Sequence, residues 1–286
     1  MEWNRENIKN NFLRRIILRV DYEGIVDIKD ILKNLESKLP SLGFTERNFG
    51  FINNAEFELN DPEMIESELK IPIKELSKIE TYKYRNSDGN VELEVNELYS
   101  ALNVDVNNYN DINKYCNIFS EVINGIKEKS VYLKINRIGL RKINDCIIRD
   151  KSRFNDYFDK EYFFDISNKL RLNSIKTEKI NTQFVDTFSV EKYMFNYIRI
   201  VSGGVLTIGS QNYDVYQAVI DIDGYSYDRE LLNTLLGDTN EISNIILELN
   251  ENLFELYSNS LTQSFKEKLL ENEFIDENIL GVNKNG

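Results

Sequence analysis

The sequence predicts an α+β fold made of two loosely repeated units of mostly antiparallel strands followed by a helix, with a long C-terminal helix. Three patterns lead to this prediction. Apolar and polar residues alternate in several segments, as in strands with one buried face. Asp88-Gly89 joins two such segments in the manner of a tight hairpin. Apolar residues recur at helical spacing in 111–127 and again in 238–269.

The first unit, 1–150, is expected to contain six strands and two helices. Asp27 caps a helix that ends at Pro40, and Asp111 caps a helix with an apolar stripe from Ile112 to Ile126. Residues 61–78 are ambiguous because Pro72 breaks either pattern. The expected strands are 12–20, 49–59, 79–85, 91–99, 100–106 and 131–150.

The second unit, 151–286, repeats this order, although one continuous domain is the alternative. A short helix capped by Ser152 is expected first, and Gly203-Gly204 should mark a turn before another short strand. Asp238 and Glu241 have capping-box spacing at the start of the long helix. The expected strands are 181–188, 193–200 and 213–222.

The longest strand-like run is 131–150, V-Y-L-K-I-N-R-I-G-L-R-K-I-N-D-C-I-I-R-D. Its apolar residues change phase near Gly139, which predicts a β-bulge or a close backbone approach there. Arg137 and Arg141 flank this glycine, and in an unbroken strand the three residues share one face.

Composition excludes several classes of function. A formal charge of -13 argues against general binding to nucleic acid. The chain has no histidine, so histidine-based catalysis and histidine-ligated zinc are excluded. The two cysteines, Cys116 and Cys146, are expected to be buried thiols rather than a disulfide. Without an export signal or a long apolar run, we expect a cytoplasmic protein that does not enter the membrane.

Residues Arg137 to Asn144 read R-I-G-L-R-K-I-N. This run resembles the core motif of a sporadically distributed family of uncharacterised prokaryotic proteins, in which Tyr or Phe usually stands at the position of Lys142. Supporting matches are Ser87 to Gly89, the helix after Tyr109, Asp221-x-Asp223 and Leu253 to Thr262. The resemblance covers most of residues 10–270 and implies no established activity. Its patchy distribution implies a link to mobile elements or antiviral defence.

Two groups of residues are candidate sites. Arg137, Gly139, Arg141 and Asn144 could hold an anion or contact a partner, because guanidinium groups and a backbone N–H bind carboxylates and phosphates. The alternative is an architectural one, in which the arginines pair with acids on neighbouring strands. Asp221 and Asp223 share one face of a strand and could bind Mg²⁺, or Ca²⁺ in a partial calcium-binding loop. Hydrolysis would need a further carboxylate such as Asp186 or Asp214.

Two functions follow from these patterns. The first is a non-enzymatic binding or regulatory protein of an antiviral defence or mobile-element system. Its protein partner would be encoded in the same operon, or would be a second copy of the chain, and it needs no cofactor. The second is a Mg²⁺-dependent enzyme in which Arg137 and Arg141 hold a phosphorylated or nucleotide ligand and Asp221 and Asp223 bind the metal.

Overall fold

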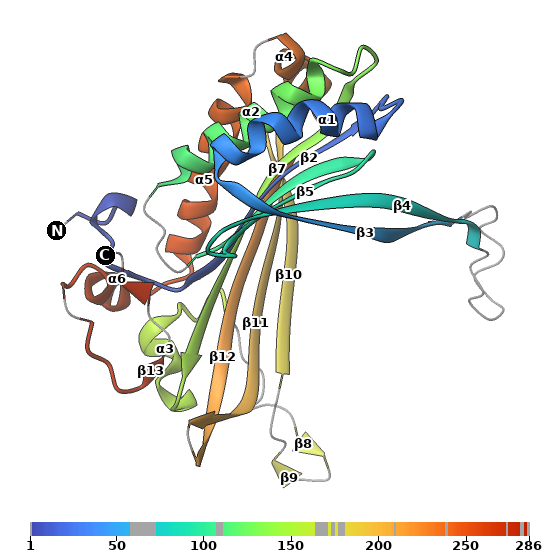
Figure 1. Cartoon of the computed structure of the whole chain (residues 1–286). Coiled ribbons are helices and arrows are strands. Elements are labelled where there is room, and N and C mark those ends of the chain that lie inside the picture. Colours follow the sequence, from blue (N-terminus) through green and yellow to red (C-terminus); the bar gives the residue numbers. More distant parts are fainter. Residues whose placement is uncertain are drawn as a thin grey trace.

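The computed structural model describes residues 2–57, 73–106, 111–163, 171–172, 175–176, 181–208, 210–237, 240–272, 274–280 and 283–284. It shows an α+β protein centred on one ten-stranded antiparallel sheet (Figure 1). The two termini lie near each other, and two short strands there, β1 (Asn10–Asn11) and β14 (Asn283–Lys284), pair with each other.

The sheet runs in the order β10-β11-β12-β7-β2-β6-β5-β4-β3, and β13 also pairs with β7. Strands from both expected units therefore share one sheet, with β2 and β7 at its centre. A separate pair consists of β8 (Arg171–Leu172) and β9 (Ile175–Lys176). The sheet strands are β2 (Leu13–Glu23), β3 (Phe44–Phe57), β4 (Ile73–Asn86), β5 (Val91–Val95), β6 (Tyr99–Asp105), β7 (Lys134–Ile148), β10 (Asn181–Val190), β11 (Tyr193–Ile208), β12 (Gln211–Ser226) and β13 (Ile279–Leu280).

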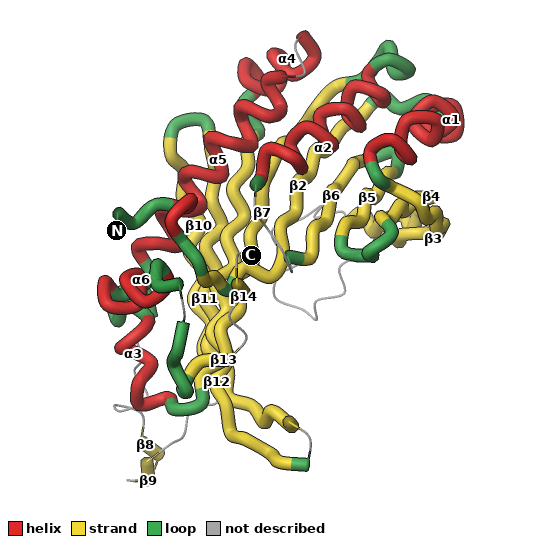
Figure 2. The backbone as a smooth tube through the Cα atoms, turned by 60° about the vertical axis from the view of Figure 1, so that its left-hand side comes forward, coloured by secondary structure: helices red, strands yellow, loops and turns green. Residues whose placement is uncertain are grey.

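Helices cover one face of the sheet. Figure 2 shows α5 (Asn240–Asn259), α2 (Ile112–Lys127) and α1 (Ile28–Lys38) side by side in front of the strands. The two expected caps are present, since Asp27 accepts from the Lys29 N–H and Asp111 from the Asn113 N–H. The remaining helices are α3 (Phe154–Tyr157), α4 (Arg229–Gly237), α6 (Gln263–Leu269) and the 3-10 turns η1 (Arg5–Asn7), η2 (Leu39–Leu42) and η4 (Lys151–Arg153).

Alternation of the strand residues separates the two faces. On β2, Ile16, Leu18 and Val20 are fully buried under the helices, whereas Ile17, Arg19 and Asp21 point to the opposite face and are partly exposed. We call this second face, on which the described part of the chain places no helix, the open face. One-sided covering is a common arrangement for an antiparallel sheet. The open face therefore leaves strand side chains within reach of a ligand or partner.

The central strand differs from its prediction in two ways. It begins at Lys134, and Val131 and Tyr132 precede it as exposed turn residues. The change of phase occurs at Asn136 rather than at Gly139. In the pairing of β2 with β7, Asp21 lies opposite Arg137 and Tyr22 opposite Ile135, so Asn136 is the extra residue. Such an irregularity reverses the faces of the side chains that follow it.

Three predictions for the second half were wrong. Gly203 and Gly204 do not turn the chain, because β11 runs through both of them and stays paired with β12 as far as Ile208. The short helix after β7 is capped by Asp150, which accepts from the Ser152 N–H, and not by Ser152. The long terminal helix is divided, because Thr262 caps a new helix, α6, by accepting from the Phe265 N–H.

Several expectations are met, and others lie outside the described residues. The Asp88-Gly89 hairpin joins β4 to β5, with Gly89 at φ 68°. Both cysteines are buried and free. Within the described ranges no helix combines the length and the apolar character that a membrane crossing requires. In the ambiguous segment 61–78, residues 73–78 belong to β4 and residues 61–72 fall outside the described residues, as do Leu59, Tyr109 and the Asp238 cap.

Candidate functional site

A polar cavity of about 480 Å³ lies on the open face of the sheet. Strands β2, β6, β7 and β12 supply most of its walls, and the R-I-G-L-R segment forms its centre. The residues that line it include Arg19, Asp21, Tyr99, Arg137, Gly139, Arg141, Asp223 and Tyr225.

Gly139 makes room for the side chain of Arg137. Tyr225 lies opposite Gly139 in the pairing of β7 with β12, and the Arg137 guanidinium lies 4.7 Å from the Tyr225 ring centroid. From there its Nη2 reaches both carboxylate oxygens of Asp223, at 3.0 and 3.1 Å. A Cβ on Gly139 would lie only 3.1 Å from Nη2 of Arg137 and 3.1 Å from Cβ of Tyr225. A side chain at position 139 would therefore crowd both Arg137 and Tyr225.

Arg141 binds the other aspartate. Its Nε and Nη2 donate to the two oxygens of Asp221 at 2.8 and 2.5 Å, which is a bidentate ion pair. In the strand register Arg141 faces Asp223, so both arginines reach their partners diagonally. The Arg141 side chain is 42% exposed, compared with 12% for Arg137. Arg141 therefore remains accessible from solvent after it has paired.

The charged contacts continue across the sheet. Arg19 Nε donates to Asp21 at 2.6 Å, and the Arg19 guanidinium lies 4.1 Å from the ring centroid of Tyr99. The Tyr99 hydroxyl donates to Glu94, which also pairs with Lys83 at 3.1 Å. We call the residues of this chain of contacts the open-face network; it comprises Lys83, Glu94, Tyr99, Arg19, Asp21, Arg137, Asp223, Arg141, Asp221 and Tyr225.

The network balances its own charges. Its four cations, Lys83, Arg19, Arg137 and Arg141, are matched by the carboxylates of Glu94, Asp21, Asp223 and Asp221.

Burial affects the titration of this network. Burial raises the pKa of Asp223, and the two nearby arginines offset only part of that rise. Burial and the Glu94 contact raise the pKa of Tyr99 to about 12, so its hydroxyl keeps its proton near neutral pH. The hydrogen bonds to Asp221 raise the pKa of Arg141 further, which keeps the guanidinium charged. Near neutral pH, Tyr99 therefore stays a hydrogen-bond donor to Glu94 and Arg141 stays a cation beside Asp221.

An apolar strip borders the network on the same face. Ile143 on β7 lies next to Asp221, and Ile198 on β11 lies on the other side of that aspartate. Val219 and Ile200 form the next row and face each other across β12 and β11. All four side chains are partly exposed. The open face thus presents apolar side chains beside arginine and tyrosine.

The structure brings together five of the six predicted site residues. Arg137, Gly139, Arg141, Asp221 and Asp223 meet on the open face. Asn144 does not join them. It is buried on the helix-covered face, where its side-chain amide donates to the Ile220 carbonyl at 3.3 Å. Its parity on the strand, opposite to that of Arg141, is the reason.

The arrangement does not favour a metal ion at Asp221 and Asp223. Each carboxylate already accepts hydrogen bonds from an arginine, so Mg²⁺ would have to displace a guanidinium group. The additional carboxylate considered for hydrolysis, Asp186, pairs with Arg199, and Asp214 is exposed. Among the side chains that the structure describes, no three acidic or sulfur ligands lie close enough to form a metal site.

The predicted site residues did not include six members of the network, which are Arg19, Asp21, Lys83, Glu94, Tyr99 and Tyr225. Arg19 and Asp21 alternate with Leu18 and Val20, so their position on the polar face of β2 was readable from the sequence. Glu94 and Tyr99 lie near Arg19 because β5 and β6 follow β2 in the sheet, and the sequence does not show this strand order. No protein-family model and no curated protein matches this chain. Candidate roles therefore rest on the geometry of the site.

Proposed function

We propose that the chain is a non-enzymatic binding protein that takes a segment of a second protein on its open face. The single observation that carries this proposal is the open-face network, in which arginine and tyrosine side chains surround a cavity next to an apolar strip. Arginine and tyrosine are enriched at the centres of protein interfaces, and apolar contact supplies much of the affinity. The mixed chemistry of this face suits a polypeptide.

The charges of the network indicate what the segment carries. Arg19 and Arg141 are 43% and 42% exposed, whereas their carboxylate partners Asp21 and Asp221 are more buried. Guanidinium groups are therefore the accessible part of each pair. We expect the partner to place backbone carbonyl oxygens at the exposed edges of the Arg19 and Arg141 guanidinium groups and apolar side chains on the strip.

A free phosphate or nucleotide is a weaker candidate for this cavity. Such an anion would compete with the carboxylates that Arg137 and Arg141 already bind. The chain as a whole carries a formal charge of -13, which repels polyanions at long range. These two facts favour a protein partner over a nucleic acid or a nucleotide.

The biological setting of this proposal comes from the resemblance to the R-I-G-L-R family. We propose that the chain is a member and acts in an antiviral defence or mobile-element system with a partner encoded in the same operon. The contacts of the motif residues support this membership. Gly139 leaves space for Arg137 to bind Asp223, and Arg141 binds Asp221. Lys142 departs from the motif and lies on the other face.

We also infer an internal repeat. The segments from β2 to α2 and from β7 to α5 follow the same order. In each segment the first strand is followed by a helical segment and then by further antiparallel strands. The last strand pairs with the first, β6 with β2 and β12 with β7, and a helix follows. This order moves the boundary of the two units from residue 150 to the residues before Lys134.

Co-expression with the products of the neighbouring genes tests the proposed function. We expect one of them to form a complex of defined stoichiometry, measured by native mass spectrometry and light scattering. A purified chain that stays monomeric and binds no product of its own operon would contradict the proposal. A complex formed only by two copies of the chain would replace the foreign partner with a second copy.

A further inference from the structure

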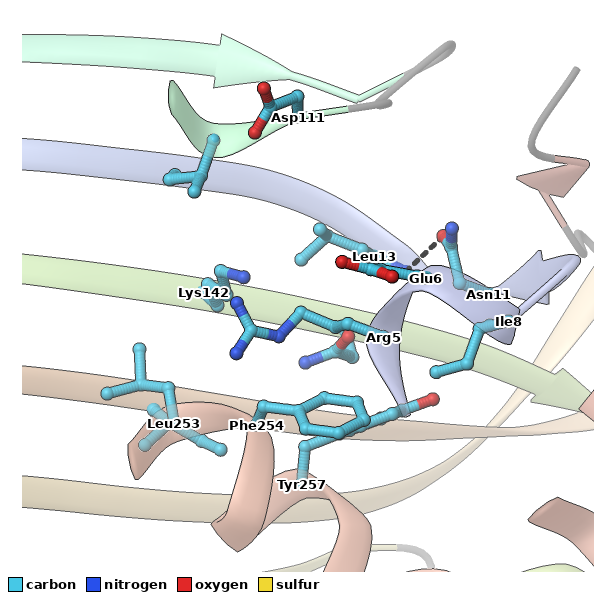
Figure 3. A pocket seen from close by; sticks show the side chains of 13 residues that line it. Arg5, Glu6, Ile8, Asn11, Leu13, Asp111, Lys142, Leu253, Phe254 and Tyr257 are labelled. Carbon is cyan, nitrogen blue, oxygen red and sulfur yellow. Dashed lines mark hydrogen bonds between the residues drawn. The ribbon is translucent and has the colours of Figure 1, made fainter. Parts of the chain in front are cut away.

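A second cavity, of about 180 Å³, lies on the helix-covered side of the sheet and belongs to a different part of the molecule from the open-face network. It is partly open to solvent and is lined by the N-terminal turn η1, the central strands and helix α5 (Figure 3). Its walls are mainly apolar or aromatic and include Leu13, Ile222, Leu253, Phe254 and Tyr257.

Two cationic side chains enter this apolar cavity. Figure 3 shows the Lys142 amine, from β7, and the Arg5 guanidinium, from η1, converging on the same region. Lys142 is 8% exposed, and burial together with the charge of Arg5 lowers the pKa of Lys142 to about 7. Arg5 lies over the Phe254 ring at 5.1 Å, and its buried Nε makes no hydrogen bond to any described residue.

Several other titratable groups lie around Lys142. Glu251 on α5 pairs with Arg5 and is 72% exposed, and its charge favours the charged form of Lys142. Asp111 on α2 accepts hydrogen bonds from the Asn113 backbone and side-chain amides. Glu6 is exposed. Burial raises the pKa of the Cys116 thiol to about 12 and also raises the pKa of Tyr257, so both are uncharged.

We propose that this cavity is a binding site for a small organic acid. The carboxylate would lie between Lys142 and Arg5, and an apolar body would pack against Ile222, Leu253 and Phe254. Two like charges close together in an apolar cavity repel each other, and an anion between them removes that repulsion. A cavity of about 150 Å³ accommodates benzene, so an aromatic or medium-chain monocarboxylate fits the volume here.

Binding should take up a proton above neutral pH. A bound carboxylate favours the charged form of Lys142, so an amine that was neutral before binding gains a proton from solvent. Below about pH 7 the amine is already charged. Affinity should therefore be constant below pH 7 and should fall by up to tenfold per pH unit above it.

Calorimetric titration of the full chain with benzoate, hexanoate and octanoate tests the site. Benzyl alcohol and 1-hexanol are the uncharged controls, and inorganic phosphate is the control without an apolar body. We expect at least one acid to bind tenfold or more tightly than its matched alcohol and than phosphate. Its heat should vary with the ionisation enthalpy of the buffer at pH 8 and not at pH 6.

Two variants identify the residues. Lys142→Met keeps the length of the side chain and removes its charge, and Lys33→Met on α1, which is 77% exposed, is the matched control. We expect Lys142→Met and Arg5→Gln each to weaken acid binding at least tenfold and Lys33→Met to leave it unchanged. Equal binding by Lys142→Met, equal binding of acid and alcohol, or no binding of any acid at millimolar concentration would overturn the proposal.

Discussion

The guanidinium of Arg137 crosses directly over Gly139, and a Cβ at position 139 would lie 3.1 Å from Arg137 Nη2. The crossing carries the arginine to Asp223, across a strand boundary, with Nη2 3.0 Å from the nearer carboxylate oxygen. The glycine between the two arginines thus leaves space for this crossing, and no bulge occurs at that residue. The crossing sets the geometry of the open-face network.

Replacing Gly139 should disturb this crossing. In Gly139→Ala the new methyl group would press on Arg137 and on Cβ of Tyr225, which is fixed to the backbone. We expect a loss of about 1–2 kcal/mol in the free energy of unfolding, typical of added bulk at a close contact, measured by urea denaturation. Gly50→Ala on β3 is the control, because nothing lies within 4 Å of its new Cβ. An equal change in both variants would contradict this explanation.

Replacing Lys142 should stabilise the chain below about pH 10. The pKa of Lys142 falls to about 7 on folding, so between pH 7 and 10.5 the unfolded state binds more protons. The stability of the natural chain should therefore rise with pH across that range, whereas its burial penalty is fully present below pH 7. At pH 7 we expect Lys142→Met to be more stable by on the order of 3–5 kcal/mol. The difference should shrink towards pH 10. If the stability difference between Lys142→Met and the natural chain does not change with pH, burial does not lower the pKa of Lys142.

The sequence was a good guide to local structure, and five of the six site residues predicted from it meet on the open face. Alternation of apolar residues identified β2 and β7, and helical spacing behind Asp111 identified α2. The same alternation places Lys142 between Leu140 and Asn144 on the buried face. Gly203 and Gly204 were misinterpreted as a turn. A glycine pair can also lie inside a strand, and here the pairing of β11 with β12 continues through both residues.

The assembly of the site depends on pairing between distant strands. Nothing local shows that β12 pairs with β7, which places Asp223 beside Arg137 from 86 residues away. The second cavity is still less visible from the sequence, since Arg5 and Tyr257 come from opposite ends of the chain. Long-range contacts of this kind follow from the topology of the sheet and not from residue patterns.

Asp276 should stabilise the C-terminal segment at neutral pH. Its carboxylate is 4% exposed and accepts from Lys268 at 2.9 Å and from the Tyr157 hydroxyl at 3.0 Å. Burial raises the pKa of Asp276, but these bonds outweigh it and leave the pKa lowered. Its contribution is therefore present above about pH 4 and lost as the pH falls further. We expect Asp276→Asn to lower the free energy of unfolding by about 3 kcal/mol at pH 7. We also expect the free energy of unfolding of this variant to fall less steeply below pH 4 than that of the natural chain. Asp30→Asn, at an exposed aspartate, is the control. The same dependence of stability on pH below pH 4 in the natural chain and in Asp276→Asn would contradict a stabilising role of the Asp276 carboxylate.

Neither cysteine should react in the folded protein. Burial raises the pKa of the Cys116 thiol to about 12 and raises that of Cys146 well above its usual value. Because the thiolate is the reactive form, a disulfide reagent should label neither thiol at pH 8 and both after unfolding in urea. Rapid labelling of either residue without denaturant would show that its surroundings open in the native state.

The affinity of the operon-encoded partner for two arginine variants tests the central claim most directly. Arg141→Ala removes a 42%-exposed arginine of the open-face network, and Arg153→Ala removes an arginine that is also 42% exposed and paired with an aspartate, but outside the network. The proposed docking predicts that Arg141→Ala raises the Kd at least tenfold while Arg153→Ala leaves it within about twofold, a difference typical of interface centres. Equal Kd values for the two variants and the natural chain would contradict docking on the open face.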